Sequence, residues 1–181
     1  MALASSDEGF FEIDKITDKI YLGDYEGALR KEKLLEFGIT HILVCGTFLV
    51  EFHPSHFKYM TIEIDDSDDQ DIMQYFDKTN KFIDESDKVF IHCRAGISRS
   101  PSVTIAYLMW KEKIPFYKAF ERVKKKRDIF PNLGFASQLI VYQNNLNILD
   151  INNDEFSSFK NTYKFYFEKS QLRDDEENFL Y

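Results

Sequence analysis

The stretch KVFIHCRAGISRS, residues 88–100, places a strand, a short loop and the start of a helix in immediate succession. Residues 88–92 are mostly β-branched or aromatic, which is typical of a short strand buried on both faces. Gly96 can adopt backbone angles that other residues avoid, so the chain can curl tightly there. From Ser100 to Lys111, apolar residues recur at helical spacing. The stretch therefore predicts one strand–loop–helix unit.

The same alternation of strands and helices continues on both sides of this unit. Runs of β-forming residues predict further strands over 13–16, 20–22, 40–45 and 57–64. Helical spacing predicts helices over 25–37, which Gly38 ends, and over 72–83, 115–126 and 135–148. Strands that alternate with helices favour a parallel sheet. The predicted fold class is α/β, with a central, mostly parallel twisted sheet of about five short strands flanked by helices.

Length and charge limit the classes of protein to which the chain can belong. Its 181 residues suit one domain, and 44% hydrophobic residues with only 7 Gly and 4 Pro argue against a fibrous or disordered chain. A net charge of −8 is unlike the basic surfaces that bind nucleic acid, so no nucleic-acid partner is expected. Two cysteines, Cys45 and Cys93, are too few for a disulfide-rich secreted scaffold.

Hydropathy and the composition of the two ends of the chain indicate where in the cell the protein lies and where its folded domain begins and ends. No apolar run approaches the ~20 residues of a membrane span, and the N-terminus lacks a signal-peptide pattern. We expect a monomer in the cytoplasm, with the nucleus as the alternative. Residues 1–9 are predicted to be a flexible arm, 10–149 a folded domain, and 150–181 an extension. In the extension, the aromatic run 156–167 predicts a helix and the acidic run 174–177 a solvated tail.

The loop at 93–99 has the features of an anion-binding site. A helix N-terminus leaves its first amides unbonded, and successive amides of a tight loop add donors to them. Arg99 offers a planar fork that can bind two phosphate oxygens. Cysteines at helix N-termini have pKa values of ~3.5–7.5 against ~8.5 for a free thiol. An ionised Cys93 beneath a phosphate-binding loop would accept a phosphoryl group.

This segment resembles the signature loop, Cys-x5-Arg with flanking His and Ser, of cysteine-based protein phosphatases. AGISRSPS at 95–102, followed by AYLM at 106–109, is most similar to the dual-specificity phosphatases. The similarity spans about 13–149 and includes IYLG at 20–23, ITHIL at 39–43 and PNLGF at 131–135. The resemblance implies a small, atypical member with a catalytic domain over 10–149 and no metal or organic cofactor.

The resemblance also implies roles for single residues. Cys93 is the expected nucleophile, and Arg99 is expected to bind the phosphoryl oxygens in a loose transition state. Ser100 would donate a hydrogen bond to the sulfur, and His92 would orient the loop and support the thiolate. Asn132 would brace the loop backbone. The residues expected to bind phosphate are Cys93, Arg94, Ala95, Gly96, Ile97, Ser98 and Arg99.

A general acid must protonate the leaving oxygen. In the family it is an Asp on the loop after a strand, and here that loop is the acidic stretch EIDDSDDQD, residues 63–71. Alignment of Tyr59 and Ile62 with the family's strand places Asp66 at the acid position. Asp65 and Asp68 are the alternatives.

The implied activity is hydrolysis of phosphotyrosine and phosphoserine or phosphothreonine in proteins. The expected partners are phosphorylated proteins, with kinases as candidates. Phosphoinositides, RNA 5′ ends and phosphorylated glucans are alternative substrates on the same scaffold, and a non-catalytic phosphate-binding module is a third interpretation. The loop carries one added cation, Arg94, which favours protein substrates over inositol lipids.

Two features outside the loop have alternative interpretations. Cys45 lies in a predicted core strand and is interpreted as packing, but a side chain facing Cys93 could trap oxidised Cys93 as a disulfide. The basic run 122–127 is interpreted as a solvated helix face, with a docking site for an acidic partner as the alternative.

Overall fold

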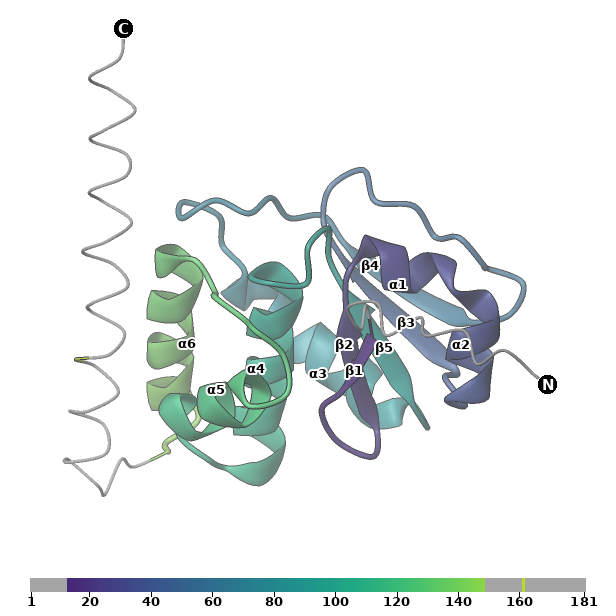
Figure 1. Ribbon diagram of the computed structural model, residues 1–181. Coiled ribbons are helices and arrows are strands. Elements are labelled where there is room, and N and C mark those ends of the chain that lie inside the picture. Colours follow the sequence, from purple (N-terminus) through teal and green to yellow (C-terminus); the bar gives the residue numbers. More distant parts are fainter. Residues whose placement is uncertain (1–12, 149–160, 162–181) are drawn as a thin grey trace, which may run out of the picture.

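A computed structural model of the chain describes residues 13–148 and residue 161. Within them, helices lie on both faces of a five-stranded sheet (Figure 1). The strands are β1 (Ile13–Lys15), β2 (Ile20–Gly23), β3 (His41–Cys45), β4 (Lys58–Ile62) and β5 (Val89–His92). The helices are α1 (Tyr25–Leu29), α2 (Lys31–Glu36), the 3-10 turn η1 (Met73–Tyr75), α3 (Phe76–Glu85), α4 (Arg99–Glu112), α5 (Phe116–Lys124) and α6 (Leu133–Asn145).

The sheet confirms the predicted α/β class. Its strand order is β1-β2-β5-β3-β4, with β1 antiparallel to β2 and the remaining pairs parallel. β5 is the central strand, so the loop after it opens in the middle of the edge formed by the carboxyl ends of the parallel strands. Ligands of open α/β sheets bind at that edge.

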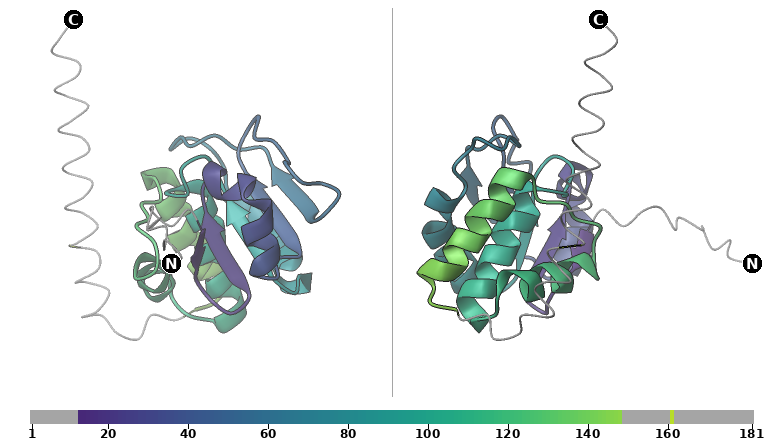
Figure 2. Two further views of the ribbon diagram at one scale, coloured as in Figure 1. Left: turned by 45° about the vertical axis from the view of Figure 1, so that its right-hand side comes forward. Right: turned by 90° about the vertical axis from the view of Figure 1, so that its left-hand side faces the viewer.

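Side chains of the central strands alternate between two apolar layers. Leu43 and Ile91 pack into the larger layer, which α3, α4, α5 and α6 cover. Ile42 and Phe90 pack into the smaller layer, which includes Leu34 of α2. Figure 2 shows the two groups of helices on opposite sides of the sheet. Because both faces are covered, the central strands consist of continuous apolar runs rather than alternating patterns.

Helix α4 is buried on all sides. Residues 100–109 are all buried, because the sheet, α3, α5 and α6 surround this helix. The phosphate-binding loop predicted from the sequence therefore leads into the most enclosed helix in the described part of the chain, which makes a rigid platform for a site.

The helix predicted over 25–37 is wrong as a single element. It is broken at Arg30, which has φ −84° and ψ 63°. In one continuous helix, Ala28 and Leu34 would point about 120° apart, because six residues turn the helix by 600°. The break lets both side chains pack into the smaller apolar layer. Gly38, with φ +74°, follows α2 as predicted.

The remaining helix ends differ from prediction by a few residues. Segment 135–148, for example, is helical over Leu133–Asn145. The predicted arm at 1–9 lies outside the described residues, and so does the extension at 150–181 apart from residue 161. No helix in the described ranges is both long and apolar enough to cross a bilayer.

Candidate active site

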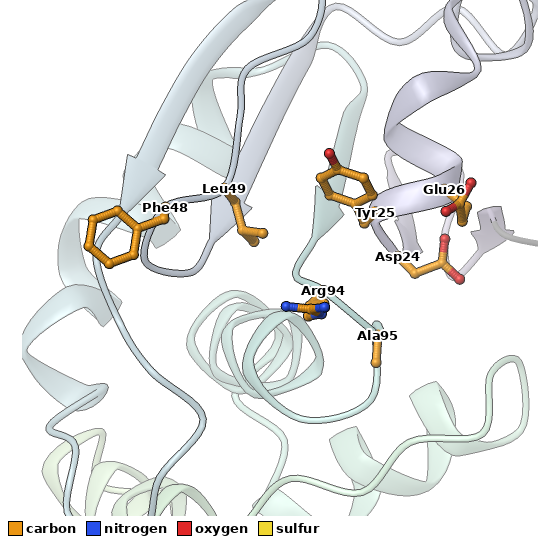
Figure 3. Close-up of a pocket in the computed structure, with 7 residues that line it drawn as sticks. All are labelled: Asp24, Tyr25, Glu26, Phe48, Leu49, Arg94 and Ala95. Atoms are coloured by element: carbon orange, nitrogen blue, oxygen red, sulfur yellow. The ribbon is translucent and has the colours of Figure 1, made fainter.

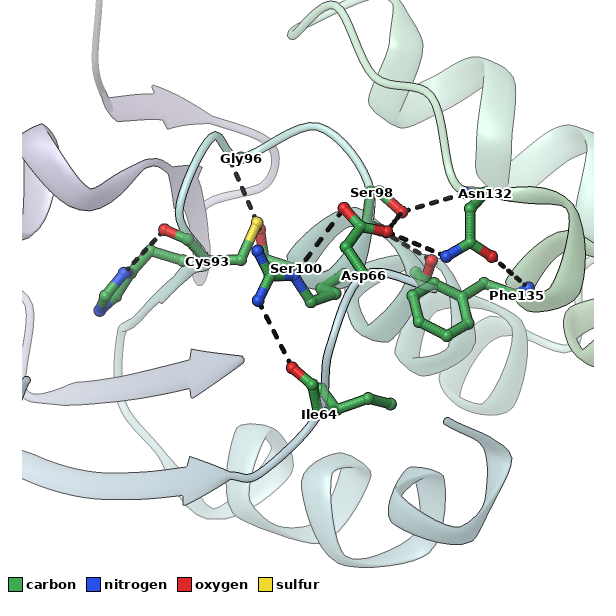
Figure 4. Close-up of polar contacts among 11 residues, drawn as sticks. Ile64, Asp66, Cys93, Gly96, Ser98, Ser100, Asn132 and Phe135 are labelled. Atoms are coloured by element: carbon green, nitrogen blue, oxygen red, sulfur yellow. Dashed lines mark hydrogen bonds and ion pairs between the residues drawn. The ribbon is translucent and has the colours of Figure 1, made fainter. Parts of the chain in front are cut away.

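The loop between β5 and α4 holds the predicted nucleophile at its base. Cys93 directly follows β5, and only 1% of its surface is exposed. Its Sγ accepts hydrogen bonds from the Gly96 N–H and the Ser100 hydroxyl, both at 3.2 Å (Figure 4). Gly96 has φ +67°, the left-handed conformation that brings its amide back toward the sulfur. Two donors on one sulfur stabilise negative charge on that atom.

Arg99, the first residue of α4, lies at the opening of the loop. Its side chain is 12% exposed, and one terminal nitrogen donates to the Ile64 carbonyl at 3.4 Å. Its Nε lies 3.8 Å from Oδ2 of Asp66. These two contacts from the β4–α3 connection hold the guanidinium where it can bind two oxygens of a phosphate seated on the loop.

Asp66 is the residue of the acidic stretch that the structure brings to the loop. Its Oδ1 accepts from the Ser98 hydroxyl at 2.6 Å and from Nδ2 of Asn132 at 2.9 Å. By contrast, Asp69 accepts from Ser67, and Asp71 accepts from the backbone of Gln74. The Asp66 carboxylate is 38% exposed and can meet a substrate arriving from solvent. The geometry favours Asp66 over its neighbours as the proton donor.

Asn132 supports the site in a different way from the one expected. Its Oδ1 accepts from the Phe135 N–H at 2.9 Å and so caps α6, which leaves Nδ2 to hold Asp66. Only its backbone N–H contacts the loop, at 3.0 Å from the Ser98 hydroxyl. Because the capping bond orients the amide group, the side chain positions the acid rather than the loop backbone (Figure 4).

The remaining loop residues divide between interior and surface. Gly96 and Ser98 are buried, whereas Arg94, Ala95 and Ile97 are exposed. The predicted phosphate-binding role of the loop rests on its backbone amides. One contributor was not predicted: Arg127 donates to the Ala95 and Gly96 carbonyls. Its place in a run of exposed basic residues gave no signal of this contact.

His92 is a buried, neutral imidazole. Burial lowers its pKa to about 4, although the hydrogen bond to the Cys93 carbonyl and nearby Asp24 both oppose this shift. Its Nδ1 donates to that carbonyl at 3.2 Å, and Nε2 has no hydrogen-bond partner within the described ranges. A neutral ring orients the start of the loop but brings no positive charge to the sulfur. Of its two expected contributions, the geometry favours orientation.

The lowered pKa of His92 predicts a pH-dependent stability. An unfolded histidine binds a proton below pH 6.5, whereas His92 in the folded chain does so only near pH 4. The neutral ring therefore contributes about 3 kcal/mol to the free energy of unfolding above pH 6.5, and this contribution is lost as pH falls to about 4. Urea unfolding should show this extra loss in the wild type but not in His92→Asn. If the free energy of unfolding fell equally with pH in the wild type and in His92→Asn, this prediction would be contradicted.

Cys45 lies beside the nucleophile. β3 and β5 pair in parallel with Val44 opposite His92. Cys45 directly follows Val44 and Cys93 directly follows His92, so the two cysteines are neighbours across the two strands. Both cysteine side chains pack into the larger apolar layer. Neighbouring strands lie about 4.8 Å apart, within the Cα separations that disulfides span. Burial raises the pKa of the Cys45 thiol, as does the nearby Cys93, so Cys45 is a neutral thiol at rest.

This placement predicts a reversible oxidised state. Hydrogen peroxide would convert the Cys93 thiolate to a sulfenic acid, and the Cys45 thiol would then form the disulfide with loss of water. We expect mass spectrometry after mild peroxide treatment to detect a Cys45–Cys93 linked peptide that a thiol reductant removes. In Cys45→Ala, Cys93 should instead proceed to sulfinic and sulfonic acid. If the wild type also gave only sulfinic and sulfonic acid at Cys93 and no linked peptide, the disulfide would be ruled out.

A hollow of about 660 Å³ adjoins the loop (Figure 3). Phe48, on the connection after β3, is 94% exposed and has φ +58°, an unfavourable conformation for a bulky residue. Residues held in such backbone conformations cluster at active sites and ligand-binding sites. The residues lining the hollow are Asp24, Tyr25, Glu26, Phe48, Leu49, Arg94 and Ala95. The hollow can take groups that flank a phosphate held on the loop.

The described side chains form no cluster of three or more His, Cys, Asp or Glu that could hold a metal ion. His41, His53 and His56 instead contact aromatic rings or neighbouring polar groups.

Comparison with known proteins identifies the family to which most of the described residues belong. The family model of the dual specificity phosphatase catalytic domain matches residues 20–145. MAP kinase phosphatase with leucine-rich repeats protein 1 of Dictyostelium discoideum is 45% identical over 74% of this chain, but the match covers only 16% of that protein. Dual specificity protein phosphatase 1 of Arabidopsis thaliana is 35% identical over 80% of this chain and 73% of its own.

Solved structures show the same architecture. The human tyrosine phosphatase-like serine/threonine/tyrosine-interacting protein superposes with a TM-score of 0.71 and 33% identity, covering 73% of this chain and 95% of that one. The Yvh1 phosphatase domain of Chaetomium thermophilum superposes with a TM-score of 0.68 and 32% identity, covering 76% and 99%. The chain spans a fifth or less of the length of several similar curated proteins.

Proposed function

Because the chain belongs to the dual specificity phosphatase family, we propose that it hydrolyses phosphotyrosine and phosphoserine or phosphothreonine in proteins through a phosphocysteine intermediate. One observation carries this proposal. The Cys93 sulfur accepts two hydrogen bonds at the base of a loop that ends at a helix N-terminus. A sulfur so placed lies directly beneath the position that the loop amides offer to a phosphate.

In the first step, the Cys93 thiolate attacks phosphorus in line with the leaving oxygen. The S–P bond forms as the bond from phosphorus to the substrate oxygen breaks, and Asp66 gives its proton to that oxygen. The Arg99 guanidinium and the loop amides bind the phosphoryl oxygens throughout. Because the transition state is loose, charge stabilisation by these donors supplies most of the rate.

In the second step, water hydrolyses the phosphocysteine. The Asp66 carboxylate takes a proton from the water as it attacks phosphorus, and the S–P bond breaks. The sulfur leaves as a thiolate, which the Ser100 hydroxyl stabilises through the hydrogen bond already present at 3.2 Å. Inorganic phosphate departs, and Asp66 is protonated again for the next turnover.

We further propose phosphorylated protein kinases as substrates. Several similar proteins are named as MAP kinase phosphatases, which supports this class without identifying one kinase. The open hollow beside the loop, with exposed Phe48 on its wall, supports a substrate whose flanking residues contact the enzyme. A small phosphate monoester would leave that hollow empty.

A side-by-side assay tests the proposed substrate class. The protein should hydrolyse para-nitrophenyl phosphate, vanadate should inhibit that turnover, and both phosphotyrosine and phosphothreonine peptides should be substrates. Faster turnover of inositol phosphates or triphosphate-ended RNA than of phosphopeptides would reject protein substrates. Absence of all turnover in a protein that binds phosphate would indicate a binding module instead.

A further inference from the structure

The backbone carbonyls of the phosphate-binding loop are held by donors outside the phosphate position. Every carbonyl from Cys93 to Ser98 accepts a hydrogen bond from elsewhere. The donors, in chain order of the carbonyls, are His92 Nδ1, the Tyr25 N–H, a terminal nitrogen of Arg127, Nε of Arg127, the Phe130 N–H, and the N–H and hydroxyl of Ser102.

This arrangement matters because a peptide group is rigid. Its C=O and N–H point in opposite directions across one plane, so holding the carbonyl on the outside of a curled loop keeps the following amide on the inside. An anion-binding loop depends on several amides converging at one point. Donors already aligned before substrate binds need no reorganisation during the reaction. The outer hydrogen bonds therefore set the inner geometry.

Arg127 alone holds two successive carbonyls of the loop. Its Nε donates to Gly96 O at 2.9 Å, and a terminal nitrogen donates to Ala95 O at 3.2 Å. These carbonyls belong to the tightest part of the loop, where Gly96 has φ +67° and its N–H donates to the Cys93 sulfur. The Arg94 and Ile97 carbonyls, on either side, have backbone donors instead.

Two carboxylates also bind the Arg127 guanidinium. Nη1 lies 2.8 Å from Asp14 of β1, and Nη2, which also donates to the Ala95 carbonyl, lies 3.4 Å from Asp24, which directly follows β2. The Arg127 side chain is only 10% exposed, and the carboxylates are 22% and 24% exposed. Arg127 thus differs from Arg122 of the same basic run, which is 42% exposed and pairs with Glu112 on the surface.

Gly96 and Arg127 are also fitted to each other sterically. A Cβ added to Gly96 would lie 2.5 Å from a terminal nitrogen of Arg127 and 2.5 Å from the Gly23 carbonyl. The loop therefore approaches Arg127 and the end of β2 as closely as a residue without a side chain allows.

We propose that Arg127 is a positioning residue for phosphate binding. It joins the β1–β2 hairpin to the Ala95 and Gly96 carbonyls and thereby keeps the amides of this segment directed at the phosphate. This inference rests on the proposed phosphatase function for its meaning, but it concerns the binding of a phosphate-like anion and can be measured without turnover.

Calorimetric binding of orthophosphate, with vanadate inhibition as a second readout, tests the role of Arg127. Arg127→Gln should weaken both by about 10- to 100-fold, the loss typical at metal sites when a hydrogen bond that orients a ligating group is removed. Arg127→Lys can donate to one of the two carbonyls, so its affinity for orthophosphate should lie between those of Arg127→Gln and the wild type. Arg122→Gln is the matched control, because it removes a surface cation of the same run, and it should bind like the wild type.

A merely structural role would lower only the melting temperature. Phosphate affinity of folded Arg127→Gln within twofold of the wild type would therefore overturn the proposal. Asp14→Asn provides a second test if Arg127→Gln does not fold, because it removes the negative charge of one partner of the guanidinium without touching the loop, and it should weaken phosphate binding severalfold. Unchanged affinity in folded Asp14→Asn would also count against the role. A wild type that binds phosphate without turnover contradicts the proposed function and leaves this comparison intact.

Discussion

Cys93→Ser is expected to abolish turnover while leaving the loop able to bind phosphate. A serine hydroxyl is not ionised near neutral pH, so the variant presents no anionic nucleophile to phosphorus. Removing the nucleophile of an enzyme with a covalent intermediate costs on the order of 10⁴- to 10⁶-fold in kcat. Arg99 remains in place, because its contacts to Ile64 and Asp66 do not involve the sulfur, and the hydrogen bonds of Arg127 to the Ala95 and Gly96 carbonyls still hold the loop.

Two measurements on the same preparation separate these effects. Turnover of para-nitrophenyl phosphate should fall below detection, whereas orthophosphate should bind within a few fold of its wild-type affinity. Cys45→Ala is the matched control, since it alters the other buried cysteine and should keep the activity. Residual turnover of more than about a hundredth of the wild-type rate in Cys93→Ser would mean that another group attacks phosphorus.

The layout of the domain could be predicted from the sequence because it depends on local patterns. Continuous apolar runs such as 40–45 indicated strands covered on both faces, and Gly38 and Gly96 marked the positions that need positive φ. The break at Arg30 could not be predicted, because both halves of 25–37 have helical spacing. Only the position of the sheet decides that Ala28 and Leu34 must face the same layer.

Parts of the site escaped prediction because they are formed by contacts between distant segments. Arg127 lies 31 positions from Gly96 in sequence, and its neighbours in the basic run face solvent. The role of Asn132 was likewise hidden, since its side-chain oxygen is occupied in capping α6 and leaves Nδ2 to hold Asp66. Sequence spacing identifies residues that act within one loop, whereas these two act across the fold.

Asp66→Asn is expected to slow the enzyme according to the leaving group. The amide oxygen can still accept from Ser98 and Asn132, so the loop keeps its shape, but the side chain has no acidic proton to give. General acid catalysis contributes about 10²- to 10⁴-fold. The loss should approach this range for phenyl phosphate and phosphothreonine peptides, whose leaving oxygens are strongly basic. It should be much smaller for para-nitrophenyl phosphate, whose leaving group departs as a stabilised anion.

The measurement is kcat/KM across a series of aryl phosphates, plotted against the basicity of the leaving phenol. The wild type should show a shallow dependence and Asp66→Asn a steep one, because in the variant the negative charge on the departing oxygen is not neutralised. Asp65→Asn and Asp68→Asn, on the same loop, should keep the wild-type slope. If one of these controls steepens while Asp66→Asn stays shallow, the acid is that residue. The contact of Asp66 with Arg99 would then serve only to hold the guanidinium over the loop.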